Sequence, residues 1–216
     1  MEPSPEAISI VVIGAMNPRI HQPHWYSATN IIHDDDMQAA VQSLISVPRV
    51  TQFAIDHIRI TCQDDRWDLF AEGWESFPRG LDIAVSTWNK LPETPVVSYG
   101  FNFFANLTLT TIGAGKLLCS LLPPRISELG VNPVGAEFKI IGIEPDLGQA
   151  TVDLRPSDQS DATITASINY HFTPDDNVGY FDLGSALNGK FSLCLESAKK
   201  KLTSIQTLFN ESEGKD

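Results

Sequence analysis

The fold is decided by two stretches of the chain, VSYGFNFFANLTL at residues 97–109 and ATITASINYHF at residues 162–172. In both, apolar side chains alternate with small polar ones, and this period of two is typical of a β-strand with one face in the core. The apolar positions are Val97, Tyr99, Phe101, Phe103, Ala105, Leu107 and Leu109 in the first stretch, and Ala162, Ile164, Ala166, Ile168, Tyr170 and Phe172 in the second. Two amphipathic strands of a sheet are therefore predicted.

A long helix is predicted from about residue 184 onward, because apolar residues recur there at alternating steps of three and four. These residues are Leu187, Phe191, Leu195, Ala198, Leu202, Ile205 and Phe209. Further strands are expected at 8–16, 51–62, 67–72, 137–143 and 150–154, and shorter helices at 37–45, 78–91 and 116–122. The fold class is thus α+β: a mostly antiparallel sheet of about six or seven strands, helices packed on one face and a long C-terminal helix.

Two local patterns refine this prediction. The strand at 51–62 changes its apolar face near Asp56, as a β-bulge would make it do, and the polar residues 63–66 form a hairpin turn into the next strand. Three aspartates at 34–36 favour a helix N-terminus. That helix is expected to pack through Met37, Val41, Leu44 and Ile45.

The length of 216 residues favours a single domain, here predicted over residues 8–210 with disordered tails at 1–7 and 211–216. Charged groups number 15 Lys and Arg against 27 Asp and Glu, a net charge of −12 that disfavours direct nucleic-acid binding. Three cysteines, Cys62, Cys119 and Cys194, form no close pair and suit a reducing compartment. No export signal or membrane span is recognised, so a cytoplasmic protein is expected.

The segment PRIHQPHWY followed by HDDD gathers possible metal ligands, namely His21, His24, His33, Asp34, Asp35 and Asp36. Imidazole and carboxylate groups suit zinc, iron or manganese. Pro23 lies between the first two histidines and prevents the helical spacing that makes paired histidines a strong metal motif. The alternative is a loop whose aromatic residues enter the core while the aspartates cap the next helix.

Other catalytic motifs do not fit the chain. Residues 111–116 lack the glycine spacing of a P-loop or a dinucleotide-binding turn, although a phosphate at this turn remains an alternative. No serine lies in a nucleophile elbow, and Cys62 and His57 would point to opposite faces of one strand. No catalytic residue and no cofactor are therefore assigned, and an enzyme is not the favoured interpretation.

The second face of the two decisive strands is polar but uncharged. An exposed sheet face usually carries Lys, Glu or Arg, whereas small uncharged groups suit a surface that contacts a partner or ligand. A plain wet face that uses threonine for its strand propensity is the alternative. The candidate contact residues are Ser98, Asn102, Asn106, Thr163, Thr165, Ser167, Asn169 and His171.

Together PRIHQPHWY, the CQDDRW hairpin, TPVVSYGFNF and the closing helix resemble a group of uncharacterised bacterial proteins, distributed sporadically among genomes. These proteins share a Trp-Tyr segment near the N-terminus and a TPV…GFNF strand. The resemblance implies a bacterial protein and carries no activity with it. The layout of a sheet closed by a C-terminal helix is also similar to export chaperones of the SecB type.

The favoured hypothesis is a non-catalytic protein-interaction module, which associates with itself or serves as a subunit of a larger bacterial assembly. Two alternatives stay open. One is a metal-dependent enzyme or metal-binding protein that uses His21, His24, His33 and the aspartates at 34–36, with Asp35 as the carboxylate ligand. The other is a small-ligand binder on the polar sheet face.

Overall fold

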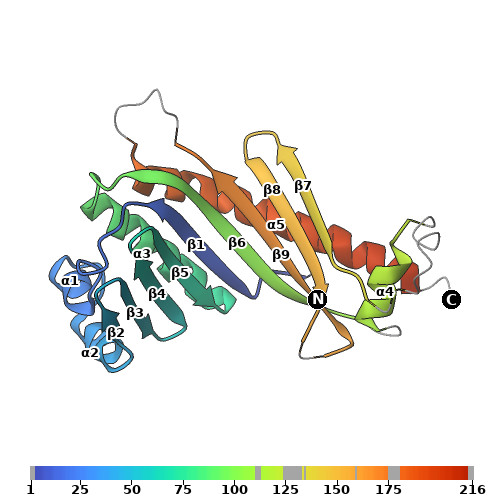
Figure 1. Cartoon of the computed structure of the whole chain (residues 1–216), viewed down its shortest axis with the longest axis horizontal. Coiled ribbons are helices and arrows are strands. Elements are labelled where there is room, and N and C mark those ends of the chain that lie inside the picture. The colour runs from blue at the N-terminus through green and yellow to red at the C-terminus, as the bar shows by residue number, and fades with distance from the viewer. Residues whose placement is uncertain are drawn as a thin grey trace. The chain divides into compact units, whose positions relative to one another are not determined.

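The computed structural model describes residues 3–109, 113–123, 133, 135–158, 160–174 and 181–213. Within these ranges the strands form one antiparallel sheet of nine, in the order β2-β3-β4-β5-β1-β6-β9-β8-β7 (Figure 1). The α+β class and the long C-terminal helix are confirmed. The predicted six or seven strands are too few, because the run at 51–62 is two strands and a short edge strand precedes it.

The strands are β1 (Ala7–Gly14), β2 (Ile45–Val47), β3 (Val50–Ile55), β4 (Ile58–Gln63), β5 (Arg66–Glu72), β6 (Val96–Thr108), β7 (Phe138–Glu144), β8 (Gly148–Pro156) and β9 (Thr163–Phe172). The helices are α1 (Pro23–Ala28), α2 (Asp34–Gln42), the 3-10 turn η1 (Trp74–Ser76), α3 (Phe77–Lys90), α4 (Ala114–Ser120) and α5 (Leu183–Glu213). Every strand predicted from the sequence has a counterpart in this order.

The chain divides into two compact units. The hairpin unit comprises Ala7–Asn102 and Tyr170–Cys194, and the edge unit comprises Met1–Glu6, Phe103–Asn169 and Leu195–Asp216. Strands β6 and β9 and helix α5 contribute residues to both units. The prediction of a single domain over residues 8–210, with tails at 1–7 and 211–216, stays a prediction.

In the hairpin unit, β3, β4 and β5 form an antiparallel meander. Ile55 pairs with Ile58, so Asp56 and His57 make a two-residue turn. Asp56 has a φ of 49°, a left-handed conformation that short polar side chains tolerate better than most. The predicted β-bulge near Asp56 is therefore wrong, because the change of apolar face marks a turn between two strands.

The helix predicted at 78–91 is α3, which packs on β5 and β1 and buries Phe77, Ile83 and Trp88. Its approach depends on Gly80, where a Cβ would lie 3.1 Å from Leu69 Cδ2. Glycine therefore lets the helix axis lie close to the sheet.

The helix predicted after the three aspartates is α2. The backbone N–H of His33 donates to Asp36 Oδ2 at 3.3 Å, which caps the first turn. Its predicted packing is wrong for Val41 and Ile45, which are 40% and 53% exposed, whereas Met37 and Leu44 are half-buried and Ala40 is the buried residue of α2. The reason is that the helix ends at Gln42, so Ile45 already belongs to the edge strand β2.

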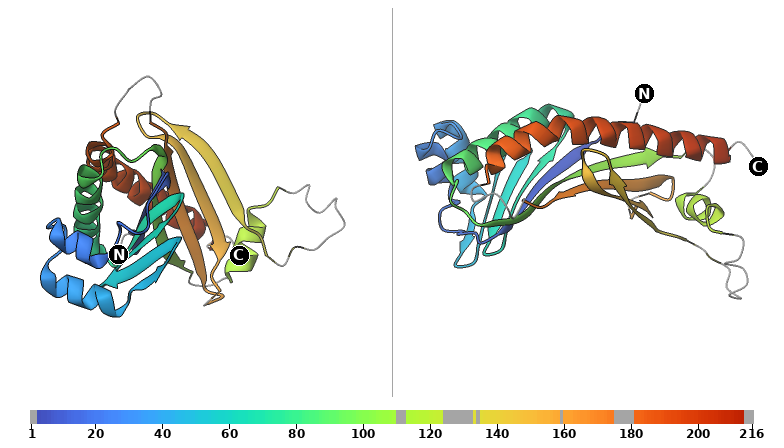
Figure 2. Two further views of the ribbon diagram at one scale, coloured as in Figure 1. Left: turned by 60° about the vertical axis from the view of Figure 1, so that its left-hand side comes forward. Right: turned by 90° about the horizontal axis from the view of Figure 1, so that it is seen from above.

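In the edge unit the C-terminal part of α5 covers one face of the sheet (Figure 2). Ile164, Ala166 and Ile168 of β9 have no exposed surface, and neither have Ala198 and Leu202 of α5. The apolar face predicted for the stretch at 162–172 is thus core from Ile164 to Tyr170, whereas Ala162 is exposed and Phe172 half-buried. The polar face of β9 points away from α5.

Helix α5 has 31 residues and carries the predicted apolar stripe. Outside this stripe the helix carries polar groups, among them the basic residues at 199–201, of which Lys201 reaches Glu144 of β7. In the described part of the chain, no helix offers the apolar stretch that crossing a bilayer requires.

Candidate functional site

The uncharged polar positions of β6 and β9 are divided between the two units. In the hairpin unit Ser98 is buried, Asn102 is half-buried and His171 is exposed. In the edge unit Asn106 is exposed, and the half-buried positions are Thr163, Thr165, Ser167 and Asn169. Ser98 is only 6% exposed and cannot serve as a contact residue for a partner.

Hydrogen bonds within the chain occupy part of this polar face in the edge unit. Thr165 Oγ1 donates to Asn106 Oδ1 at 3.1 Å, which links β9 to β6. Asn106 Nδ2 in turn donates to Glu6 Oε2 at 2.9 Å. Both ends of this amide are engaged, so these side chains contribute to the order of the sheet.

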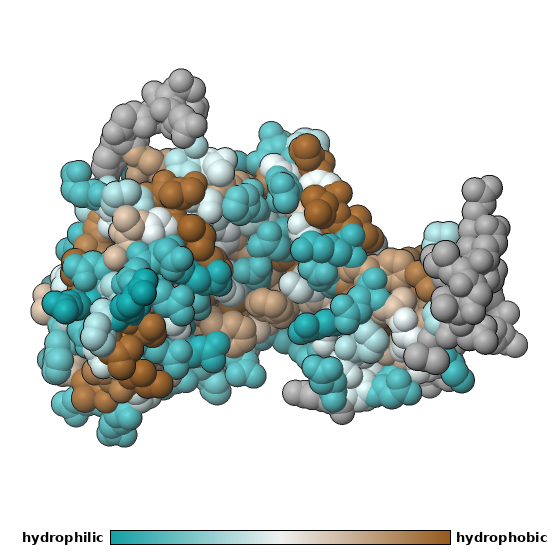
Figure 3. Space-filling model, in the orientation of Figure 1, coloured by the Kyte–Doolittle hydropathy of each residue, from teal (hydrophilic) through white to brown (hydrophobic). Residues whose placement is uncertain are grey.

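A different part of the same face is apolar. Ile141 is 62% and Ile143 is 87% exposed on β7. Successive residues of a strand point to opposite faces, and Ile140 faces α5. Ile141 and Ile143 therefore lie on the face away from α5, where Ile141 is paired with Thr151 of β8. Figure 3 shows hydrophobic surface along this strand.

Strand β7 is also the last strand in the sheet order, and no described strand pairs with its free side. Sheet edges in natural proteins are usually protected by charges, prolines or bulges. Among the seven residues of β7 the charges are Lys139 and Glu144, and Glu144 is engaged by Lys201 Nζ at 2.6 Å and by Ser197 Oγ at 2.7 Å. We call Phe138–Glu144, with its exposed isoleucines, the β7 edge.

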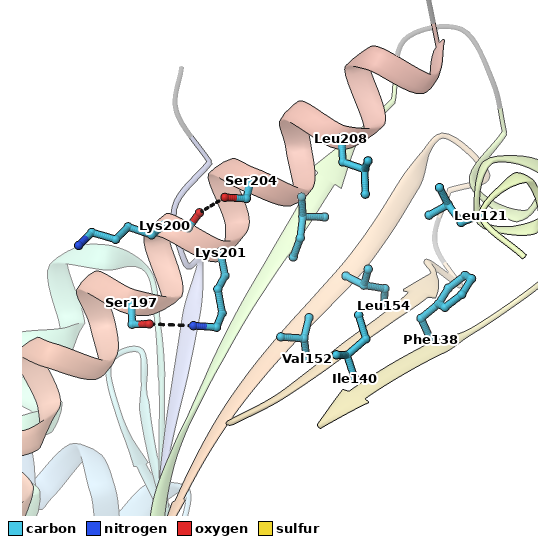
Figure 4. Close-up of a pocket in the computed structure, with 11 residues that line it drawn as sticks. Leu121, Phe138, Ile140, Val152, Leu154, Ser197, Lys200, Lys201, Ser204 and Leu208 are labelled. Atoms are coloured by element: carbon cyan, nitrogen blue, oxygen red, sulfur yellow. Dashed lines mark hydrogen bonds between the residues drawn. The ribbon is translucent and has the colours of Figure 1, made fainter. Parts of the chain in front are cut away.

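An apolar groove of about 670 Å³ lies on the other face of β7, between the hairpin β7–β8 and α5 (Figure 4). Its strand wall consists of two cross-strand pairs, Phe138 with Leu154 and Ile140 with Val152. The remaining lining residues are Leu121, Ser197, Lys200, Lys201, Ser204, Ile205 and Leu208. The groove and the β7 edge together leave β7 exposed on both faces.

The proposed metal ligands are not brought together. His21 lies in the core, only 2% exposed, whereas His24, His33 and Asp35 are exposed. The segment predicted as a loop contains α1, which begins at Pro23 and turns His24 to solvent while His21 points inward. Among the described residues, no three His, Cys, Asp or Glu side chains are grouped so that they would hold a metal ion.

His21 belongs instead to a buried hydrogen-bonded cluster in the hairpin unit. Its Nδ1 lies 3.0 Å from the hydroxyl of Tyr26, which accepts a hydrogen bond from Trp67 Nε1 at 3.2 Å. Burial lowers the pKa of His21 from 6.5 to about 4 and raises the pKa of Tyr26. Both groups are therefore neutral at pH 7, and the cluster is structural.

The phosphate alternative rests on residues 111–116, of which 111 and 112 lie outside the described residues. The amide of Ala114 is already used, since it donates to the carbonyl oxygen of Asp161 at 2.6 Å. The Asp161 carboxylate also lies beside Gly113, where a Cβ would be 2.7 Å from its Oδ2. A carboxylate at this position repels a phosphate.

Cys62 is not set up as a nucleophile. Burial, together with the carboxylates of Asp64 and Asp68, raises the pKa of its thiol to about 12. Because the thiolate is the reactive form, Cys62 stays inert at neutral pH.

The β7 edge and the groove are therefore the exposed features that distinguish the edge unit. Sequence reasoning predicted a strand at 137–143 but missed its exposure, because apolar residues on both alternations are typical of a strand covered on both faces.

A scan against protein-family models and a search of curated proteins find no match for this chain.

Proposed function

We propose that this chain is a non-catalytic protein-interaction module that associates with a second copy of itself through the β7 edge. The observation that carries the proposal is the exposure of five of the seven residues of β7, including Ile143 at 87%. Burying such a strand removes apolar surface from water and pairs its free backbone groups.

The mode of association is strand addition. Backbone N–H and C=O groups on the free side of β7 pair with a second extended strand, and the side chains on each face set the specificity. Antiparallel pairing of two copies of β7 would extend the sheet across a two-fold axis.

The strand suits its own copy because of its side-chain pattern. When two copies of β7 pair in a symmetric antiparallel register, a two-fold axis perpendicular to the sheet relates them. A given residue then lies on the same face of the joined sheet in both copies. In the register centred on Gly142, Ile141 of one copy would pair with Ile143 of the second copy, so the isoleucines would shield each other from water. A different subunit supplying the strand, as in a larger bacterial assembly, is the competing outcome.

The test is sedimentation equilibrium of the purified chain over a concentration series, with Ile143→Lys as the disrupting variant. Because symmetry places the substitution twice in each interface, dimerisation should weaken about tenfold or more. Val97→Lys is the matched control, since Val97 is a strand residue that is 66% exposed and lies outside β7.

Two results would count against the proposal. The first is a chain that stays monomeric at every concentration. The second is a dimer that Ile143→Lys and Val97→Lys affect equally, which would place the interface elsewhere. Both variants reduce the net negative charge by the same amount, so electrostatic repulsion does not separate them.

A further inference from the structure

The groove beside α5 points to a second binding activity, independent of strand pairing. We infer that it binds a free single-chain amphiphile with an anionic head, such as a fatty carboxylate. The volume of about 670 Å³ lies within the range of small-molecule sites, and seven of its eleven lining residues are apolar.

The wall residues show why the occupant has an apolar chain. Phe138, Ile140, Val152 and Leu154 form a continuous strip on two strands, and Leu208 of α5 faces them across the groove (Figure 4). Ile140 is 56% and Leu208 48% exposed, so an occupant would remove both from water. The hydroxyl of Ser204 donates to the carbonyl oxygen of Lys200, so it is already satisfied within the helix.

The charge at the rim favours an anionic head. The run at 199–201 lies on α5 in a chain whose net charge is −12, and two of its members, Lys200 and Lys201, line the groove. Lys201 is paired with Glu144 at 2.6 Å, and Lys199, which does not line the groove, is paired with Glu196 at 3.2 Å. Lys200 is exposed and forms no ion pair with any described residue. Its side chain points away from the strand wall in Figure 4, and its flexible four-carbon stem lets the ammonium group turn to the rim when an anionic head is bound.

A free amphiphile fits these charges better than a membrane does. A small ligand at the groove responds mainly to charges within a Debye length of about 8 Å at physiological salt. Because Glu144 offsets Lys201, Lys200 is the lining residue that supplies the excess positive charge. An anionic bilayer meets a much larger part of the acidic surface and is repelled by it.

The experiment is calorimetric titration of the full chain with decanoate, laurate and dodecyltrimethylammonium, each below its micelle concentration. Saturable binding of one laurate per chain is expected, with affinity rising by up to about fourfold for each added CH2 group. The cationic amphiphile should bind more weakly than laurate.

Variants locate the site. Leu208→Glu should weaken laurate binding tenfold or more, whereas Leu193→Glu, on the same helix at 53% exposure but outside the groove, should leave it unchanged. Lys200→Glu should weaken laurate binding more than Lys199→Glu, which changes the net charge equally.

Four results would overturn the inference: no saturable binding of laurate monomers, equal loss in Leu208→Glu and Leu193→Glu, equal affinity for the cationic amphiphile, or binding only to vesicles of phosphatidylcholine and phosphatidylglycerol. Because Leu208 and Lys200 lie outside β7, loss of laurate binding in their variants with intact dimerisation separates this activity from self-association.

Discussion

The buried state of His21 predicts a specific loss of stability in acid. In the folded chain its pKa is lowered by burial from 6.5 to about 4. Between these values the unfolded chain binds a proton that the folded chain does not, so the free energy of unfolding falls as the pH falls from 6.5 towards 4. Above pH 6.5 the imidazole is neutral in both states and has no such effect.

The magnitude follows from the two pKa values. A pKa difference of one corresponds to about 1.36 kcal/mol. At pH 4.5 His21 is almost fully protonated in the unfolded chain and mostly neutral in the folded one, which destabilises the fold by about 2.5 kcal/mol relative to pH 7.

The assay is urea unfolding at pH 7 and pH 4.5, followed by the fluorescence of buried Trp67 and Trp88. Carboxylates also titrate in this range, so the informative quantity is the difference between variants. His21→Gln should lose about 2 kcal/mol less than the native chain between the two pH values, because glutamine has no proton to gain. His24→Gln, at the exposed histidine three residues later, should behave like the native chain.

The reasoning is refuted if His21→Gln shows the same acid-induced loss as the native chain. It is also refuted if His24→Gln removes the loss as effectively. If His21→Gln is too unstable for urea titration, the imidazole C–H resonances of His21 in the native chain give the same information. They should shift only below about pH 5.

Three further outcomes are expected. Gly100→Ala should lower the free energy of unfolding in urea by about 1–3 kcal/mol, because the added Cβ would lie 2.4 Å from the carbonyl oxygen of Tyr170. Gly142→Ala is the control in the same titration, since a Cβ at Gly142 would have no atom within 4 Å. Thr165→Val should cost about 1 kcal/mol for the hydrogen bond that its hydroxyl donates across the polar face, and Thr163→Val, which loses no such bond, should cost less in thermal unfolding. Self-association should strengthen when NaCl is raised from about 10 to about 500 mM, because salt screens the repulsion between two copies of charge −12. Sedimentation equilibrium measures this change, and weaker self-association at high salt would contradict an apolar interface.

The alternating strands were predictable because each carries its own evidence. In β9 and in β6 from Phe101 onward the buried and exposed sides can be distinguished from the residues alone, and the stripe on α5 is equally local. At the start of β6 the prediction is reversed, since Val97 is exposed and Ser98 is buried. The turn at Asp56 was missed because it lacks glycine and because β-rich residues continue on both sides of it. Helix α1 was missed because six residues are too few to show a helical period.

The candidate site depended on long-range order that no local pattern contains. Whether the isoleucines of β7 are buried depends on which strand lies beyond β7, and the described sheet ends there. The same limit applies to Ser98, which alternates as a polar-face residue but lies in a stretch of β6 that is buried on both faces. The histidines showed a composition suited to metal, yet His21 is buried before α1, His24 is exposed on α1 and His33 caps α2.

The central claim is that the β7 edge pairs with a second copy, and hydrogen–deuterium exchange across a concentration series tests it most directly. Pairing places the outward-facing amides of Phe138–Glu144 in hydrogen bonds, so their exchange should slow as the chain dimerises. The opposite edge strand, Ile45–Val47, is the internal control and should exchange at the same rate at every concentration. Dimerisation without slower exchange in β7, or equal slowing at both edges, would contradict the account.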